Sequence, residues 1–111
     1  MNESPIQEWQ FEKEKVTLKN VYPSAILTVE KKGRNREKYI TKTVIYNIEK
    51  NGEVTYTAKE MNPFLILGIR GSVQILQRII TEGRKNHPGI TVFEILKMHY
   101  DKRAAQSLRI E

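Results

Sequence analysis

The sequence predicts an α+β fold, with an antiparallel sheet in the first half of the chain and helices in the second. Two observations carry this prediction. In the first half, apolar and polar side chains alternate on both sides of an Asn-Gly dipeptide, which is typical of a hairpin. Near residue 60 the apolar period changes from two to that of a helix. We therefore expect about four or five strands with helices over one face, in a single small domain spanning residues 1–111.

The clearest strand pattern lies in residues 39–59. One face carries Ile40, Val44, Tyr46 and Ile48, and the other face is polar. Asn51-Gly52 follows at once, and this dipeptide favours a two-residue type I′ turn. The alternation then resumes, which predicts a hairpin over residues 39–59 with four buried side chains: Val44, Tyr46, Val54 and Tyr56.

Two earlier strands are also indicated. Val16 and Leu18 alternate with polar residues, and Tyr22-Pro23 then breaks the pattern because a residue before proline is held extended. Residues 26–30 can then begin a second strand. The next eight residues, KKGRNREK (31–38), contain five basic residues and one carboxylate, so we expect an exposed loop between two strands.

The segment FLILGIRGS (64–72) fits two structures. It is either a buried strand or a short helix that Asn62 caps and Pro63 begins, and we favour the strand because glycines weaken a helix. From Ser72, a candidate N-cap, the apolar residues recur at helical spacing. This predicts an amphipathic helix that ends at Gly83 or at His87-Pro88-Gly89.

A second helix is predicted after Thr91. Thr91 and Glu94 have the spacing of a capping box, and one face of the following segment is apolar. The alternative is a strand, because ITVFEI is rich in β-branched and aromatic residues. We favour the helix, and the tail from Asp101 has too little periodicity to place.

The residues that usually carry chemistry are sparse. There is no cysteine, and His87 and His99 stand twelve residues apart without the spacing of zinc or iron ligands. The carboxylates show no paired arrangement, and GIRGS lacks the lysine of a phosphate-binding loop. We therefore expect no enzymatic activity, no metal and no cofactor. The longest apolar run is too short to span a membrane, and no secretory signal is recognisable, so we expect a soluble cytoplasmic protein.

Positive charge is the strongest functional signal. The net charge of +6 and the pI of about 9.6 favour a polyanionic partner, which would be attracted at long range. A lysine contacts a phosphate as a point charge, whereas an arginine can donate two parallel hydrogen bonds to it. An aromatic residue can stack on a base. The candidate nucleic-acid-binding residues are Lys31, Lys32, Arg34, Arg36, Lys38, Tyr39, Arg78, Arg84 and Lys85. The second helix adds Lys97, Lys102 and Arg103. The alternatives are that KKGRNREK is only a solvated hairpin tip and that Tyr39 belongs to the core.

The chain also resembles a known family in its general character. It is small, basic and rich in lysine, isoleucine and asparagine, and its β-rich first half passes through NPFLILGIRGS into ITVFEILKMHY. In these respects it is similar to the small regulators of pheromone-responsive conjugative plasmids in Gram-positive bacteria. That resemblance implies a PUA-like, RNA-binding fold, which is a strongly bent β structure with short helices. No functional residue is carried over from it.

These observations together favour a non-catalytic nucleic-acid-binding accessory or regulatory protein. Its expected partner is RNA or single-stranded DNA, with RNA favoured by the resemblance. The alternative is a protein-binding module, acting as an inhibitor or oligomeric adaptor through a strand edge or an apolar helix face.

Overall fold

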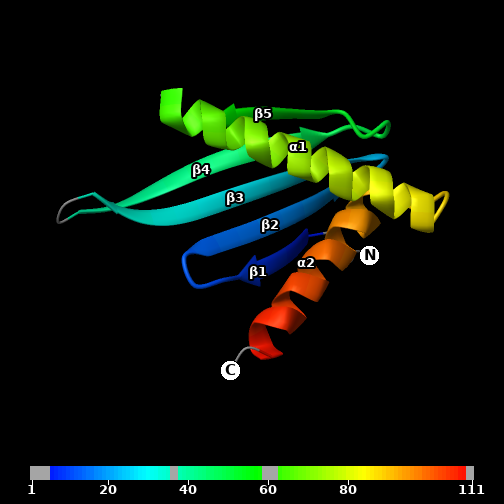
Figure 1. Cartoon of the computed structure of the whole chain (residues 1–111). Coiled ribbons are helices and arrows are strands. Elements are labelled where there is room, and N and C mark those ends of the chain that lie inside the picture. Colours follow the sequence, from blue (N-terminus) through cyan, green and yellow to red (C-terminus); the bar gives the residue numbers. More distant parts are fainter. Residues whose placement is uncertain (1–5, 36–37, 59–62, 110–111) are drawn as a thin grey trace.

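The computed structural model describes residues 6–35, 38–58 and 63–109, and their side chains except those of residues 34, 35, 38–41, 63–67 and 107–109. The α+β prediction is confirmed, because a five-stranded antiparallel sheet precedes two helices (Figure 1). The elements in chain order are β1 (Ile6–Gln10), β2 (Glu14–Val21), β3 (Ser24–Asn35), β4 (Lys38–Ile48), β5 (Val54–Ala58), α1 (Pro63–Asn86) and α2 (Val92–Arg109).

Each strand pairs with the next one along the chain, so the sheet is a meander in the order β1-β2-β3-β4-β5. The break at Tyr22-Pro23 is confirmed, since these two residues connect β2 to β3. β1 was not predicted. Its segment IQEWQ buries only Trp9, which is 8% exposed, so it lacks the apolar alternation that would mark a strand.

The hairpin of residues 39–59 is confirmed by β4 and β5, although residue 59 lies outside the described residues. Val44, Tyr46 and Val54 are buried as predicted, whereas Tyr56 is only half-buried against the core. The predicted two-residue turn is wrong. The amide of Gly52 donates to the carbonyl of Glu49 at 2.9 Å, and Gly52 has a φ of 93°. The loop therefore has three residues, and its last one takes the left-handed conformation that glycine accepts.

The expectation that residues 31–38 form a loop is also corrected. Lys31 to Asn35 belong to β3 and pair with Lys38 to Lys42 of β4, so KKGRNREK is mostly strand. The register is set by buried pairs such as Val29 with Val44. The ladder can continue past the core because each added pair forms backbone hydrogen bonds. Arg36 lies outside the described residues.

The strand predicted for residues 64–72 is wrong, because α1 already begins at Pro63. Ser72 is therefore inside the helix instead of capping it, and its hydroxyl donates to the carbonyl of Gly68 at 3.2 Å. Each helical glycine costs about 1 kcal/mol relative to alanine, and a helix that buries Leu76 and Ile80 can bear that cost. The end of α1 before His87-Pro88-Gly89 agrees with one of the two predicted stops.

The second helix is confirmed in place of the alternative strand. The amide of Glu94 donates to Oγ1 of Thr91 at 3.2 Å, which is one half of the predicted capping box. The helix continues to Arg109 and so includes most of the tail that the sequence left unplaced.

Both helices cover the same face of the sheet and diverge from the short connection between them (Figure 1). α1 packs against β5, and α2 packs against β1, β2 and β3. Near the connection the helices approach closely, since a Cβ placed on Gly83 of α1 would lie 2.6 Å from Cγ2 of Ile95 on α2. The helices therefore enclose a V whose open end faces the β3–β4 hairpin.

Candidate nucleic-acid interface

A groove lies between the two helices at the open end of the V. Its floor is the sheet surface at Leu27, Val29 and Tyr46, and its walls are α1 and α2. Two adjacent hollows continue it, one towards the β1–β2 turn and one between β4 and the start of α1, and Lys31 borders all three. We call this surface, between α1, α2, residues 12–14 and the strand segments 29–32 and 42–46, the basic groove.

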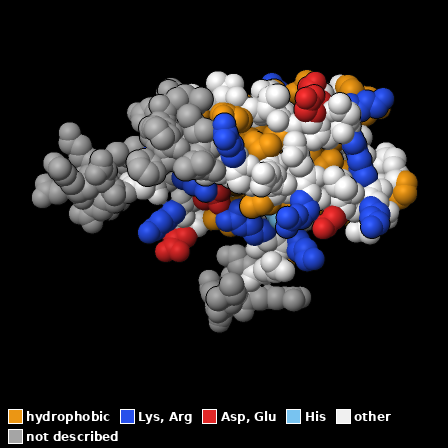
Figure 2. Space-filling view, turned by 45° about the horizontal axis from the view of Figure 1, so that its top comes forward, with side chains coloured by type: hydrophobic (Ala, Val, Ile, Leu, Met, Phe, Trp, Pro, Cys, Tyr) orange, Lys and Arg blue, Asp and Glu red, His pale blue; other side chains and the backbone are white. Residues whose placement is uncertain are grey.

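The basic groove carries an excess of positive charge. Four cations border it, namely Lys13, Lys31, Lys42 and Arg103, against two carboxylates, Glu12 and Glu14. The opposite end of the sheet is balanced, because the hollow there is bordered by two cations, Lys50 and Arg84, and two carboxylates, Glu49 and Glu53. The space-filling view shows Lys and Arg side chains gathered beside a histidine and apolar side chains in its lower middle (Figure 2).

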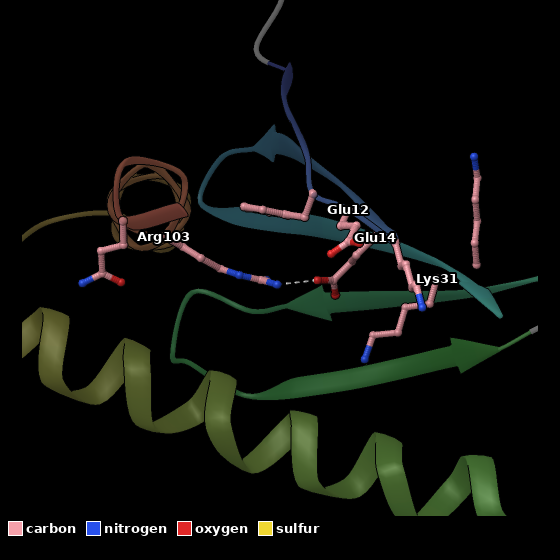
Figure 3. A pocket seen from close by; sticks show the side chains of 8 residues that line it. Glu12, Glu14, Lys31 and Arg103 are labelled. Atoms are coloured by element: carbon pink, nitrogen blue, oxygen red, sulfur yellow. Dashed lines mark hydrogen bonds and ion pairs between the residues drawn. The ribbon is translucent and has the colours of Figure 1, made fainter. Parts of the chain in front are cut away.

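Three charged residues stand in a row across the helix-facing side of the sheet. Glu14 of β2 lies directly opposite Lys31 of β3, which in turn lies directly opposite Lys42 of β4. Nη2 of Arg103 donates to Oε1 of Glu14 at 2.7 Å, so Glu14 lies between Arg103 and Lys31 (Figure 3). The guanidinium of Arg103 also stacks on Phe11, 4.0 Å from the ring centre. Arg103 therefore neutralises Glu14, and within the described part of the chain Lys31 and Lys42 form no ion pair.

Neutral polar groups lie among these cations. Burial raises the pKa of Tyr46, an effect that Ser72 partly offsets, and burial raises the pKa of Tyr100 to about 12. Both hydroxyls therefore remain protonated at neutral pH. Burial lowers the pKa of His99, and the charges of Arg103 and Lys102 lower it further, so its imidazole is neutral at pH 7. The groove thus combines positively charged side chains with uncharged hydrogen-bonding groups.

The structure brings only some of the predicted residues to this groove. Lys31 is at its centre. Strand alternation directs the side chain of Lys32 to the opposite sheet face, and its amide, which donates to the carbonyl of Lys13, borders the end of the groove. Arg34, Lys38 and Tyr39 are hairpin strand residues whose side chains lie outside the described residues.

The predicted residues of α1 lie elsewhere. Arg78 is exposed on the outer side of the helix. Arg84 lies beside the turn at Gly52, and Lys85 is one residue further along. These last two are about 24 Å along the helix from Ile69, which borders the groove. They therefore do not join the cations of the groove.

Sequence reasoning missed Lys42 and Lys13. Lys42 could have been found from strand alternation, because it precedes Val44 by two residues and so shares its face. Arg103 was noted only as one of three cations on the second helix, and its position depends on how α2 crosses β2. The pairing of segments far apart in the sequence is what makes the groove.

Comparison with family models, with curated proteins and with solved structures finds no significant match. In the described ranges, no three or more His, Asp or Glu side chains gather as metal ligands would. Neither α1 nor α2, as far as they are described, combines the length and apolar character of a membrane-spanning helix.

Proposed function

We propose that this protein binds single-stranded nucleic acid, RNA in preference to DNA, along the basic groove. It would act in the cytoplasm as a non-catalytic accessory or regulatory protein. This role is the one that its resemblance to the small plasmid regulators suggests. The observation that supports this proposal is the gathering of Lys13, Lys31, Lys42 and Arg103, from four separate segments, around one groove. The preference for RNA rests on the resemblance alone.

The shape of the groove favours a flexible strand over a rigid duplex. Lys31 and Arg103 border a depression between the two helices, and the exposed apolar side chain of Ile75 stands on its α1 wall. A single strand can enter such a depression and place bases on apolar surface while its phosphates meet the cations. A duplex presents its phosphates on a convex surface and keeps its bases stacked.

The test compares two double variants that remove the same charge. Lys31→Gln with Lys42→Gln acts in the groove, whereas the control, Lys19→Gln with Lys85→Gln, acts at exposed sites on the other sheet face and at the far end of α1. Binding of a fluorescent RNA oligomer would be measured over a range of salt concentrations. We expect the groove variant to weaken binding and flatten the logarithmic salt slope by about 1.4, because each lost phosphate contact on a single strand contributes about 0.7.

The control should lower affinity only slightly, through the net charge it shares with the groove variant. Equal losses in the two variants would show that the groove is not the binding surface. An absence of salt-dependent binding in the unaltered protein would overturn the nucleic-acid proposal altogether.

The alternative, a protein-binding module, has one observation in its favour. Ile75 stands on the α1 wall of the groove and is 57% exposed, so an apolar segment of a partner would find a contact there. Ile75→Ser should then abolish partner binding while leaving any affinity for RNA within about twofold, since a rim side chain contributes little to phosphate contacts.

A further inference from the structure

We propose that the basic groove contains a site for one nucleotide unit, in which Lys31 and Lys42 hold the phosphate and the pocket beside them receives an unpaired base. This inference rests on the proposed function and specifies how the groove would recognise its ligand. Val44, Tyr46, Ile69 and Ser72 line the pocket between the sheet and α1.

The two lysines are placed as a phosphate clamp. They are directly opposite each other in the β3–β4 ladder, where side chains on the same face start about 5 Å apart. Like charges in this position repel one another, and the nearest carboxylate across the ladder, Glu14, is already held by Arg103 at 2.7 Å. A phosphate between the two ammonium groups would relieve the repulsion and accept hydrogen bonds from both.

The adjoining pocket has the size and lining that a base requires. Its volume is about 280 Å³, just below the roughly 300–1,000 Å³ of drug-sized ligand sites, so it suits one ring system with its sugar. Val44, which is 7% exposed, and Ile69, which is 2% exposed, form the apolar back of the pocket, where a base would meet their exposed edges. The Tyr46 hydroxyl, whose pKa is raised by burial, could donate a hydrogen bond to its polar edge, and Ser72, whose own proton goes to the carbonyl of Gly68, could accept one. An inorganic or peptide phosphate would use the lysines but leave this pocket unfilled.

Gly68 provides a way to block the pocket without harming the fold. It borders the pocket from α1, and a Cβ built on it would meet nothing within 4 Å. Gly68→Leu would therefore project into the entrance while improving the helix propensity of α1. Gly71→Leu makes the same change three residues later, where a Cβ also meets nothing within 4 Å and the residue does not border the pocket.

The experiment measures binding of two probes, an oligouridylate of about ten nucleotides, within the usual range of single-strand sites, and inorganic polyphosphate of equal charge. Circular dichroism would confirm that each variant is folded. We expect Gly68→Leu to weaken oligouridylate binding at least fivefold, because each base contact contributes about 1–3 kcal/mol. Polyphosphate binding should change less than twofold, and Gly71→Leu should alter neither.

Unchanged oligouridylate binding by Gly68→Leu would overturn the nucleotide site. If Lys31→Gln with Lys42→Gln still weakened binding, the proposed function would stand and recognition would be through phosphates alone. Equal loss of both probes in Gly68→Leu would also overturn the inference, since the substitution would then act on the phosphate clamp. Failure of the unaltered protein to bind oligouridylate would overturn the proposed function as well.

Discussion

Gly83 sets how closely α1 approaches α2, and replacing it should destabilise the protein even though alanine is the better helix former. It lies inside α1 and faces Ile95 of α2, which is buried. A Cβ at this position would lie 2.6 Å from Cγ2 and 3.0 Å from Cγ1 of Ile95. Both atoms belong to the rigid branch point of a β-branched side chain, so the contact cannot be relieved by moving a flexible end.

The size of the effect follows from two opposing contributions. Alanine in place of glycine gains about 1 kcal/mol of helix propensity. Forcing an extra methyl group into a packed interior costs about 1–3 kcal/mol. At Gly71, where a Cβ meets nothing within 4 Å, only the gain applies. We therefore expect Gly71→Ala to be more stable than the unaltered protein, and Gly83→Ala to be less stable than Gly71→Ala by about 1–3 kcal/mol.

Urea unfolding followed by the fluorescence of Trp9 would measure both variants, because Trp9 is the single tryptophan and is buried against α2. The midpoint should move in opposite directions for Gly83→Ala and Gly71→Ala at an unchanged slope. Equal stabilisation by the two substitutions would refute the close approach of the helices at Gly83, and with it the geometry that closes the V at this end.

Three further predictions concern other parts of the fold. Gly52→Ala should lower the free energy of unfolding by about 1–2 kcal/mol, measured in urea, because Gly52 has a φ of 93° that a Cβ disfavours; no loss would refute the assigned turn. The pKa of His99 is lowered by burial, so the unfolded chain binds more protons near its ordinary pKa of 6.5. The stability from this group is therefore complete above that pH and is lost as the pH falls through it. His99→Gln should make the free energy of unfolding decline less between about pH 7.5 and 5.5. An unchanged dependence of stability on pH would contradict this. Asp101→Ala removes the acceptor of Trp9 Nε1 at 3.0 Å. It should cost about 1 kcal/mol and more than Lys97→Ala, because it removes both the hydrogen bond from Trp9 and the ion pair with Lys97. The reverse order would contradict a stabilising hydrogen bond between Trp9 and Asp101.

The parts of the fold that the sequence predicted are those with local causes. The alternation in β4 and β5 and the Thr91–Glu94 cap act within a few residues, so they could be read directly. β1 could not, because its one buried residue depends on a distant helix. Trp9 stacks on Tyr100 with ring centres 5.2 Å apart and donates to Asp101. The start of α1 was misread for the same reason, since the burial of Ile69 against the sheet outweighs the local preference of Gly68 and Gly71.

From the sequence, the candidate site was predicted mainly as a cluster of basic residues in the connection between two strands. Lys31 was identified because it stands in a visibly basic segment. Lys42 stands among threonines and isoleucine, where its charge has no neighbours in sequence, and it meets Lys31 only through the β3–β4 register. Arg103 reaches Glu14 across 89 positions of the chain. Composition can predict that a protein is basic, but strand register and helix crossing decide which of its cations share a surface.

The groove's charge pattern separates what the fold needs from what a ligand would need. Glu14 and Arg103 satisfy each other, and Arg103 also covers Phe11, so this pair helps to attach α2 to β2. Lys31 and Lys42 add nothing comparable, because they face each other's like charge and Glu14, on the other side of Lys31, already pairs with Arg103. If they serve binding, the variant without them should unfold at the same or a higher urea concentration than the unaltered protein while losing affinity for RNA. RNA should then raise the midpoint of the unaltered protein more than that of the variant, because a ligand that binds only the folded state stabilises it by an amount that grows with the logarithm of its concentration divided by its Kd. A groove variant that unfolds more easily would instead assign these lysines to the stability of the hairpin.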